Sequence, residues 1–201
     1  MKRWALLAGL SLGWGALAVG LGGCGEALVG MGATVGVAAA QERSVGDAVD
    51  DAAILANVNH HLLQKSQHLF ANVDVEVLEG RVLLTGNVRQ PDDRVEAARL
   101  AWRTNGVREV LNEVGVRDRT SLKDYATDTW ITTQLKARLL RDTGVSAINY
   151  TVETVNGVVY LLGIAQSQEE LDRVTGHARN IKSVTKVVSH VVLKDDPKRR
   201  S

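Results

Sequence analysis

The stretch Asn-Gly-Val-Val-Tyr-Leu-Leu-Gly, residues 156–163, decides the fold of this chain. An Asn-Gly pair beside alternating apolar residues is the strongest short-range hairpin signal, because a type I′ turn requires positive φ at both central positions. The stretch therefore predicts two antiparallel strands that are joined at Asn156 and Gly157.

A second copy of this pattern lies 77 residues earlier in the chain. There Glu79 and Gly80 stand at the turn, between expected strands at 73–78 and 81–88. From Asp51 onward the two copies stay in register without a gap. The matching pairs are Ile54 with Ile131, Leu62 with Leu139, Leu63 with Leu140, Val75 with Val152, Glu76 with Glu153, Gly80 with Gly157, Val82 with Val159, Leu84 with Leu161, Gly86 with Gly163, Ala101 with Ala178, Val107 with Val184, Val110 with Val187, and Val114 with Val191. This many matches at one offset indicate two copies of one small domain.

A helix is expected before each hairpin. Asp51 and Asp128 suit its start, because a carboxylate can cap free backbone N–H groups. In the second copy Ile131, Leu135 and Leu139 recur at helical spacing, so they define the buried face of that helix.

A second helix and a last strand complete each copy. Pro91 suits the first helical position in the first copy, and residues 167–170 form a capping box in the second. Valine-rich segments at 107–114 and 184–191 predict the last strands. Each copy then has the order α-β-β-α-β, with two helices on one face of a mixed three-stranded sheet. The expected fold class is α+β, with two such domains in tandem.

The domain boundaries follow from the repeat and from the composition around it. We expect the first domain at 44–116, a polar linker at 117–127, the second domain at 128–194 and a disordered tail at 195–201. Residues 24–43 are rich in Gly, Ala and Val and lack helical patterning, which predicts a flexible apolar tether.

The N-terminus has the features of a bacterial export signal. Lys2 and Arg3 precede an apolar stretch at 4–21. The segment Leu-Gly-Gly-Cys at 21–24 resembles the lipobox of bacterial lipoproteins, where the thiol receives diacylglycerol, the chain is cut before the cysteine, and the new amine is acylated with a fatty acid such as palmitate. We therefore expect a signal peptide at 1–23 and a membrane anchor that is effectively permanent.

Two other interpretations of this N-terminus stay open. Ordinary signal-peptide cleavage after Ala38-Ala39-Ala40 is one, and an uncleaved helix at 4–24 is the other, since its length is near the ~20 residues that span a bilayer. Cys24 is the only cysteine and has no disulfide partner, which favours lipid attachment at Cys24. In lipoproteins generally an Asp after the cysteine favours the inner membrane, so Gly25 favours the outer membrane.

Charge and residue content argue against several classes of function. Without Lys2 and Arg3 the chain has 22 basic residues against 23 acidic ones, so no global attraction to nucleic acid is expected. The adjacent His60 and His61 point about 100° apart on a helix, which predicts surface histidines and no metal site. No nucleophile and base can be paired from spacing, so we expect no catalytic residue and no cofactor. The glycine-containing turn at 80–86 lacks the Lys-Ser/Thr of a phosphate loop.

The first helix of the second copy carries a candidate binding surface. With Ile131 facing the sheet, Trp130 lies on the opposite side, where no core can receive it. Indole prefers the boundary between headgroups and acyl chains, and each nearby basic residue can contribute about 1 kcal/mol near an anionic surface. The candidate phospholipid-binding residues are Trp130, Gln134, Lys136, Arg138 and Arg141.

The first copy lacks this chemistry at the equivalent positions. They are Ala53, Asn57, His60 and Gln64, which include neither an aromatic wedge nor a cation. An alternative is that Trp130 packs against the first domain or the linker. Trp102 shares a helical face with Val95 and Ala98 and is expected to pack in the core or at a domain interface.

The pattern of hairpin turn, Val-x-Leu-x-Gly, helix and Val-rich strand closely resembles the BON domain of bacterial exported proteins. Two such domains behind a lipobox resemble the dual-BON outer-membrane lipoproteins, including the division- and outer-membrane-stress-associated lipid-binding lipoprotein family. The resemblance covers nearly all of the chain after Cys24, and its most specific stretches are 128–133 and 156–163. Gly86 and Gly163 match the signature glycine of the family, whose role is expected to be close packing at a strand end. Gly80 and Gly157 are the structural glycines of the turns.

The resemblance also implies a function. It implies a non-enzymatic lipoprotein that faces the periplasm, supports outer-membrane integrity and binds anionic phospholipid, such as phosphatidylglycerol or cardiolipin, through its second domain. A membrane-anchored adaptor that recruits an envelope assembly or cell-division partner remains the alternative. Trp130 would then anchor a protein interface, as exposed tryptophans often do. Vesicle flotation of residues 44–201 separates the two, because an adaptor without its acyl anchor stays in the soluble fraction.

Overall fold

A computed structural model describes residues 42–117 and 121–199, so the expected signal peptide, Cys24 and most of the tether lie outside the described residues. The first domain consists of α2 (Val45–Lys65), α3 (Gln67–Asn72), β1 (Val73–Leu78), β2 (Arg81–Val88), α4 (Pro91–Trp102), β3 (Glu109–Asn112) and β4 (Gly115–Val116). The second domain consists of α5 (Leu122–Arg141), η1 (Ala147–Asn149), β5 (Tyr150–Val155), β6 (Val158–Ala165), α6 (Gln168–Arg179) and β7 (Lys186–Leu193), followed by η2 (Pro197–Arg199). The expected α+β class and the order α-β-β-α-β are confirmed.

The two sheets have the same topology and the same register. In each sheet the hairpin is antiparallel and the last strand pairs in parallel with the second strand of the hairpin. Arg81 pairs with Glu109, Asn87 with Gly115 and, in the second domain, Val158 with Lys186, always 28 residues apart. The strands β3 and β4 are therefore one line of pairing that is interrupted for two residues, whereas β7 is continuous.

Both hairpins turn with positive φ at two successive residues. The φ angles are 52° at Glu79 and 71° at Gly80, and 52° at Asn156 and 76° at Gly157. This is the backbone of the turn that the Asn-Gly pair predicts. Glu79 adopts the same backbone conformation in the first domain, although glutamate tolerates positive φ less readily than asparagine does.

The first helix of each domain begins earlier than the sequence suggested. Ser44 and Ser121 are the N-caps, each in a capping box with an aspartate three residues later. The expected helix starts at Asp51 and Asp128 are therefore wrong, and α5 begins at Leu122, inside the stretch expected to be a linker. The repeat thus extends upstream to the two serines, which are again 77 residues apart.

Asp51 and Asp128 are buried inside their helices, where they cap the hairpin turns instead. The carboxylate of Asp51 accepts hydrogen bonds from the backbone N–H groups of Glu79 and Gly80, both at 2.8 Å. Asp128 accepts from Asn156 at 2.7 Å and from Gly157 at 2.8 Å. A carboxylate that receives two N–H bonds ties the first helix of each domain to the turn of its hairpin.

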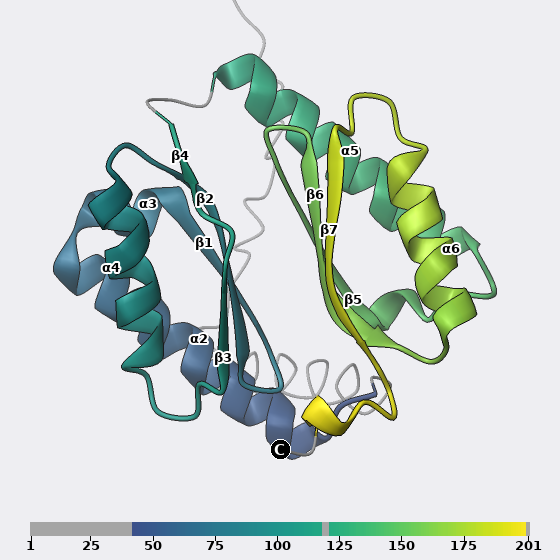
Figure 1. Ribbon diagram of the computed structural model, residues 1–201, viewed down its shortest axis with the longest axis horizontal. Coiled ribbons are helices and arrows are strands. Elements are labelled where there is room, and N and C mark those ends of the chain that lie inside the picture. The colour runs from purple at the N-terminus through teal and green to yellow at the C-terminus, as the bar shows by residue number, and fades with distance from the viewer. Residues whose placement is uncertain (1–41, 118–120, 200–201) are drawn as a thin grey trace, which may run out of the picture.

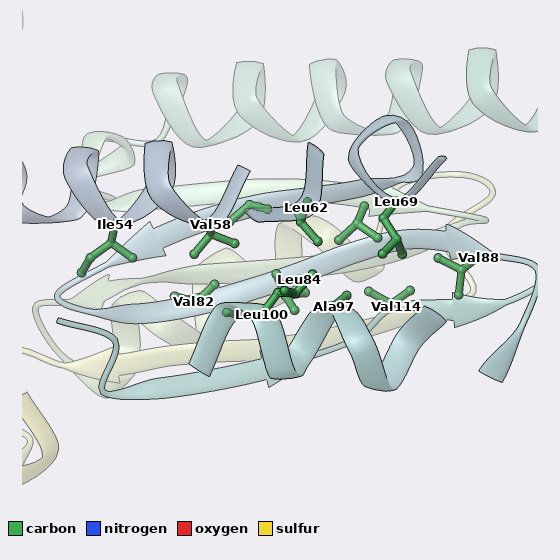
Figure 2. Close-up of a cluster of buried hydrophobic side chains, with 13 residues drawn as sticks. Ile54, Val58, Leu62, Leu69, Val82, Leu84, Val88, Ala97, Leu100 and Val114 are labelled. Carbon is green, nitrogen blue, oxygen red and sulfur yellow. The ribbon is translucent and has the colours of Figure 1, made fainter. Parts of the chain in front are cut away.

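Helices cover one face of each sheet. Figure 2 shows the first of these cores, where Ile54, Val58 and Leu62 of α2 meet Leu84 of β2 and Leu100 of α4. The equivalent core of the second domain is built on Ile131, Leu135 and Leu139 of α5, Val152, Val159 and Leu161 of the hairpin, and Val174 and Ala178 of α6. Its buried helix residues include the three that the sequence predicted.

The other faces of the two sheets pack against each other. Leu83, Tyr160 and Leu162 form a buried cluster there, joined by the partly buried Leu78, Leu111, Val155, Val158 and Val188. Leu78 with Val155, Leu83 with Tyr160 and Leu111 with Val188 are equivalent positions of the repeat, so the interface uses the same face of both domains. The result is four layers, helix, sheet, sheet and helix, with the helices on the two outer sides (Figure 1).

The C-terminal segment returns to the first domain. The Arg199 guanidinium donates to both carboxylate oxygens of Glu79, at 2.7 and 3.0 Å, and to the carbonyl oxygen of Glu42 at 2.8 Å. Glu42 also donates its N–H to the side chain of Asn149 at 3.0 Å. The tail was expected to be disordered from residue 195, but η2 and these bonds fix its described part against the hairpin turn and the end of the tether.

Candidate functional site

The outer face of α5 is the candidate site. Its buried side, from Asp128 to Leu139, faces the sheet, and Trp130 lies on the other side with 46% of its surface exposed. Trp130 is thus accessible to a partner outside the domain. Trp130 belongs to none of the buried hydrophobic clusters, including the one between the two sheets.

The structure separates the five candidate residues into three groups. Gln134 and Arg141 lie on the same side of α5 as Trp130, with Gln134 half-buried and Arg141 exposed. Arg138 is directed toward α6, where Nη1 donates to the carbonyl oxygen of Asn180 at 3.2 Å. A cation at this place compensates the free carbonyls of a helix end, so Arg138 has a structural role beside any contact with lipid.

Lys136 lies on the side of α5 that faces the seam, by which we mean the contact between the two sheets where Glu76 and Glu153 lie. Its charge lowers the pKa of Glu153, which burial raises, and it acts in the same direction on Glu76. On a helical wheel Lys136 is about 120° from Trp130. It therefore lies at the edge of the outer face farther from Trp130 and Arg141, one helical turn before Leu140, and it is exposed.

Exposed leucines on α5 were missed in the sequence. Leu122 is 90% exposed and Leu140 is 77% exposed, and both lie on the outward half of the helix with Trp130. Continuing the helical wheel from Trp130 in both directions would have found them. With them, the outer face of α5 has apolar side chains over its whole length and the cation of Arg141 at one end.

A groove borders α5 on the side of the first domain. It has a volume of about 570 Å³ and lies between Leu122, Tyr125 and Thr129 of α5 and Asn72 and Asn87 of the first domain. A smaller groove of about 210 Å³ occupies the equivalent place beside α2, where Glu42 and Arg43 line it. The N-terminal half of α5 is therefore open on both its outer face and its inner flank.

The two signature glycines lie where another segment passes closely. A Cβ on Gly163 would lie 2.6 Å from the carbonyl oxygen of Asn149, and one on Gly86 would overlap the carbonyl oxygen of Asn72. Asn72 and Asn149 are themselves equivalent positions, immediately before the hairpin. The glycines thus permit the entry of the chain into each hairpin, the close packing expected at these positions.

The turn glycines are enclosed in a similar way. A Cβ on Gly80 would lie 2.7 Å from the carbonyl oxygen of Gly106, and one on Gly157 would lie 2.9 Å from that of Ser183. Both pairs belong to the contact between the hairpin turn and the loop before the last strand. Their role is in the fold, at a distance from the face of α5.

Two equivalent glutamates lie in the seam between the sheets. Glu76 pairs with Leu83 and Glu153 pairs with Tyr160, and paired residues of an antiparallel ladder point to the same face. Burial raises the pKa of Glu76 to about 7, helped by the negative charges of Glu153 and Asp74 and opposed by Lys136. The seam thus holds carboxyl groups that are costly to ionise.

The α4 helix differs from the expectation made for it. Trp102 is 55% exposed and Val95 is 66% exposed, so Trp102 packs neither in the core nor at the domain interface. Only Ala98 of this expected group packs against the core.

No metal or membrane-spanning element is found in the part of the chain that the structure describes. Among residues 42–117 and 121–199 no cluster of three His, Cys, Asp or Glu residues has the arrangement of a metal site. No helix in these ranges is long and apolar enough to cross a bilayer.

The fold and the exposed helix together define a protein of two tandem α+β modules with exposed apolar side chains on the outer face of α5. The family model of the BON domain matches residues 50–118 and 127–195. The chain therefore belongs to the BON-domain family, as its sequence pattern suggested, and no catalytic family is indicated.

Three relatives are similar in sequence to most of this chain. A protein of Anaplasma centrale described as an uncharacterized protein in the gshII 5′ region is 48% identical over 153 residues, 76% of this chain and all of that protein. The outer membrane lipoprotein DolP of Haemophilus influenzae is 32% identical over 189 residues, 94% of each chain. The osmotically-inducible protein Y of Escherichia coli is 34% identical over 152 residues, 75% of this chain and 76% of that protein.

Proposed function

We propose that this chain is a non-enzymatic lipoprotein of the outer membrane that binds anionic phospholipid through the outer face of α5. Acylation of Cys24 anchors it, its domains face the periplasm, and lipid binding supports the integrity of the membrane. The observation that carries the proposal is the exposure of Trp130 between Leu122 and Leu140 on one helix face.

The chemistry of this face suits the boundary of a bilayer. Leucine side chains gain about 1.5–3 kcal/mol each when they leave water, and indole favours the depth of the headgroups. Arg141 stands at the end of the helix, where it can reach a phosphate, and contributes about 1 kcal/mol near an anionic surface. The face then combines an apolar wedge with a cation, as interfacial helices do.

The relation to DolP supports the proposed location. That relative is an outer membrane lipoprotein by its name, and this chain matches nearly all of it. An acyl anchor raises the effective concentration of α5 at the membrane, so weak contacts by Trp130 and the leucines suffice.

Vesicle flotation tests the proposal. A fragment that begins at Glu42 keeps the Arg43–Asp51 ion pair at 2.7 Å and needs no acyl chain. We expect this fragment to float with vesicles of phosphatidylglycerol or cardiolipin and to stay in solution with phosphatidylcholine. Trp130→Glu should abolish the binding and leave the circular dichroism spectrum unchanged, because the side chain is outside the core.

Trp102→Glu is the matched control. It places the same charge on a similarly exposed tryptophan of the other domain, so any general effect of added negative charge appears in both variants. Unchanged flotation of the Trp130 variant, or an equal loss in both variants, would refute the assignment of lipid binding to α5.

A further inference from the structure

The α4 helix of the first domain presents a second exposed tryptophan. Its buried residues Ala97, Leu100 and Ala101 face the core. Trp102 and Val95 are seven residues apart on the opposite side and point directly outward. They form an apolar stripe that no described segment covers.

Basic side chains lie on one flank of α4 beside this stripe. A groove of about 440 Å³ between α2 and α4 has Lys65, Arg99 and Arg103 on its walls and Leu100 at its side. Its one carboxylate is Glu96, and hydrogen bonds from Arg99 first, with the charge of Lys65 as a smaller cause, lower the pKa of Glu96 to about 2. Glu96 is therefore ionised at neutral pH, and three cations against one carboxylate leave the groove with net positive charge.

The stripe and the cations belong to the first domain alone. At the positions equivalent to Val95, Arg99, Trp102 and Arg103, the second domain has Asp172, Gly176, Arg179 and Asn180. The BON fold therefore does not require an aromatic and basic surface at this place, and its presence in one copy points to a separate role.

The direction of α4 decides what can reach it. The helices α4 and α5 lie in the two outer layers, on opposite sides of the packed sheets (Figure 1). Trp102 and Trp130 each lie on the side of their helix away from the core of their own domain, and the two helices belong to different outer layers (Figure 1). We therefore expect the α4 stripe to stay open to soluble partners when the outer face of α5 contacts a membrane.

We propose that the α4 surface, made of Val95, Trp102, Lys65, Arg99 and Arg103, binds an acidic segment of another protein. An apolar side chain of that segment packs against Trp102, and its carboxylates pair with the cations of the groove. Tryptophan and arginine are the residues that most often carry binding energy at protein interfaces, and arginine pairs with carboxylates through two parallel hydrogen bonds. This role goes beyond lipid binding and does not depend on it.

A defined peptide pair tests the chemistry. The full-length chain is reconstituted in nanodiscs of phosphatidylcholine, which carry no net negative charge. Fluorescence anisotropy then follows a labelled amphipathic peptide with leucine on one face and glutamate on the other, and a matched peptide with lysine in place of glutamate. The glutamate peptide should bind saturably and more weakly at high salt, and the lysine peptide should not bind.

Variants locate the binding. Trp102→Ser and Arg99→Ser should each weaken the glutamate peptide about tenfold, Trp102→Phe should retain most of the affinity, and Trp130→Ser should leave it unchanged. The proposal is overturned if the glutamate peptide does not bind, if the lysine peptide binds equally, or if Trp102→Ser has wild-type affinity at unchanged circular dichroism.

Flotation with phosphatidylglycerol vesicles separates a protein partner from a lipid. Trp102→Ser should float as wild type does, because Trp102 lies on α4, outside the α5 face that is proposed to bind lipid. Loss of flotation in Trp102→Ser would mean that lipid occupies this surface, which also overturns the proposal. Should Trp130→Glu keep its flotation while the glutamate peptide still binds through Trp102, the proposed lipid function of α5 fails and the present proposal stands.

Discussion

At the scale of single residues, Gly86 combines two constraints. Its φ of 105° lies in a region that L side chains rarely adopt, and a Cβ there would overlap the carbonyl oxygen of Asn72. Gly86→Ala is therefore expected to lower the free energy of unfolding by about 2–4 kcal/mol. Urea denaturation followed by circular dichroism measures the loss.

Gly176 provides the control for this substitution. It lies inside α6, and a Cβ there would have nothing within 4 Å. Gly176→Ala should be neutral or should stabilise the protein by up to about 1 kcal/mol, since alanine is the better helix former. If Gly86→Ala were as stable as Gly176→Ala, the overlap with Asn72 would be relieved at little cost.

Two features stabilise each hairpin turn, its positive φ angles and the carboxylate that caps it, and residue types alone predicted only the first. Asn156 and Gly157 predict positive φ, and the structure has it. Asp51 and Asp128 were recognised as capping residues but assigned to helix starts, because the capping chemistry is the same wherever N–H groups are free. The turn that each carboxylate caps lies about 28 residues away in sequence, and only the packing of helix on hairpin brings the two together.

At the scale of elements, α5 and α2 are equivalent helices with different outer faces. Leu140 is the most exposed large apolar residue in the second half of α5. If α5 lies on the bilayer, Leu140→Glu loses the burial of a leucine, about 1.5–3 kcal/mol, and adds a charge of the wrong sign. We expect binding to phosphatidylglycerol vesicles to fall more than tenfold while the melting temperature stays unchanged.

Leu63 is the matched position on α2, and it is exposed as well. Leu63→Glu makes the same chemical change on the helix that has no tryptophan at the position of Trp130. Vesicle binding of this variant should remain within about twofold of wild type. A comparable loss in Leu63→Glu would mean that both first helices contact lipid and that α5 has no special role.

The helical wheel predicted the outward direction of Trp130 but not the grouping of its neighbours. The buried residues Ile131, Leu135 and Leu139 fix the side of α5 that meets the sheet, and this requires sequence alone. Which flank meets α6 and which meets the first domain depends on how the domains pack. Arg138 and Lys136 therefore went into one patch with Trp130, although each lies on a different flank.

At the scale of the whole molecule, the packing of the two sheets was not predicted. The continuous apolar runs of β2 and β6 are typical of strands buried on both faces. The helices of each domain cover only one face of its sheet. A run such as Val-Leu-Leu shows that a second cover exists without showing what it is. Here the cover is the other copy of the domain, through Leu83 and Tyr160.

The seam between the sheets makes the stability of the molecule depend on pH. Burial first, and then the charges of Glu153 and Asp74, raise the pKa of Glu76 to about 7 from an ordinary value of 4.5, and Lys136 opposes this shift. The folded protein therefore binds more protons than the unfolded chain between about pH 4.5 and 7. The contribution of Glu76 to stability is greatest below this window, falls as the pH rises through it, and leaves a constant penalty above it.

Glu76→Gln removes this penalty, because the amide is neutral at every pH. At pH 8 the variant should exceed wild type in the free energy of unfolding by on the order of 1 kcal/mol, and at pH 4 the difference should vanish. Urea denaturation at both pH values measures this difference.

Glu153→Gln should act in the same direction, since burial raises the pKa of Glu153 as well. Because each single variant also relieves the repulsion between the two carboxylates, the double variant should gain less than the sum of the single gains. An equal gain of Glu76→Gln at both pH values would show that ionisation of Glu76 does not cause the penalty. Strict additivity of the two substitutions would show that the carboxylates do not couple across the seam.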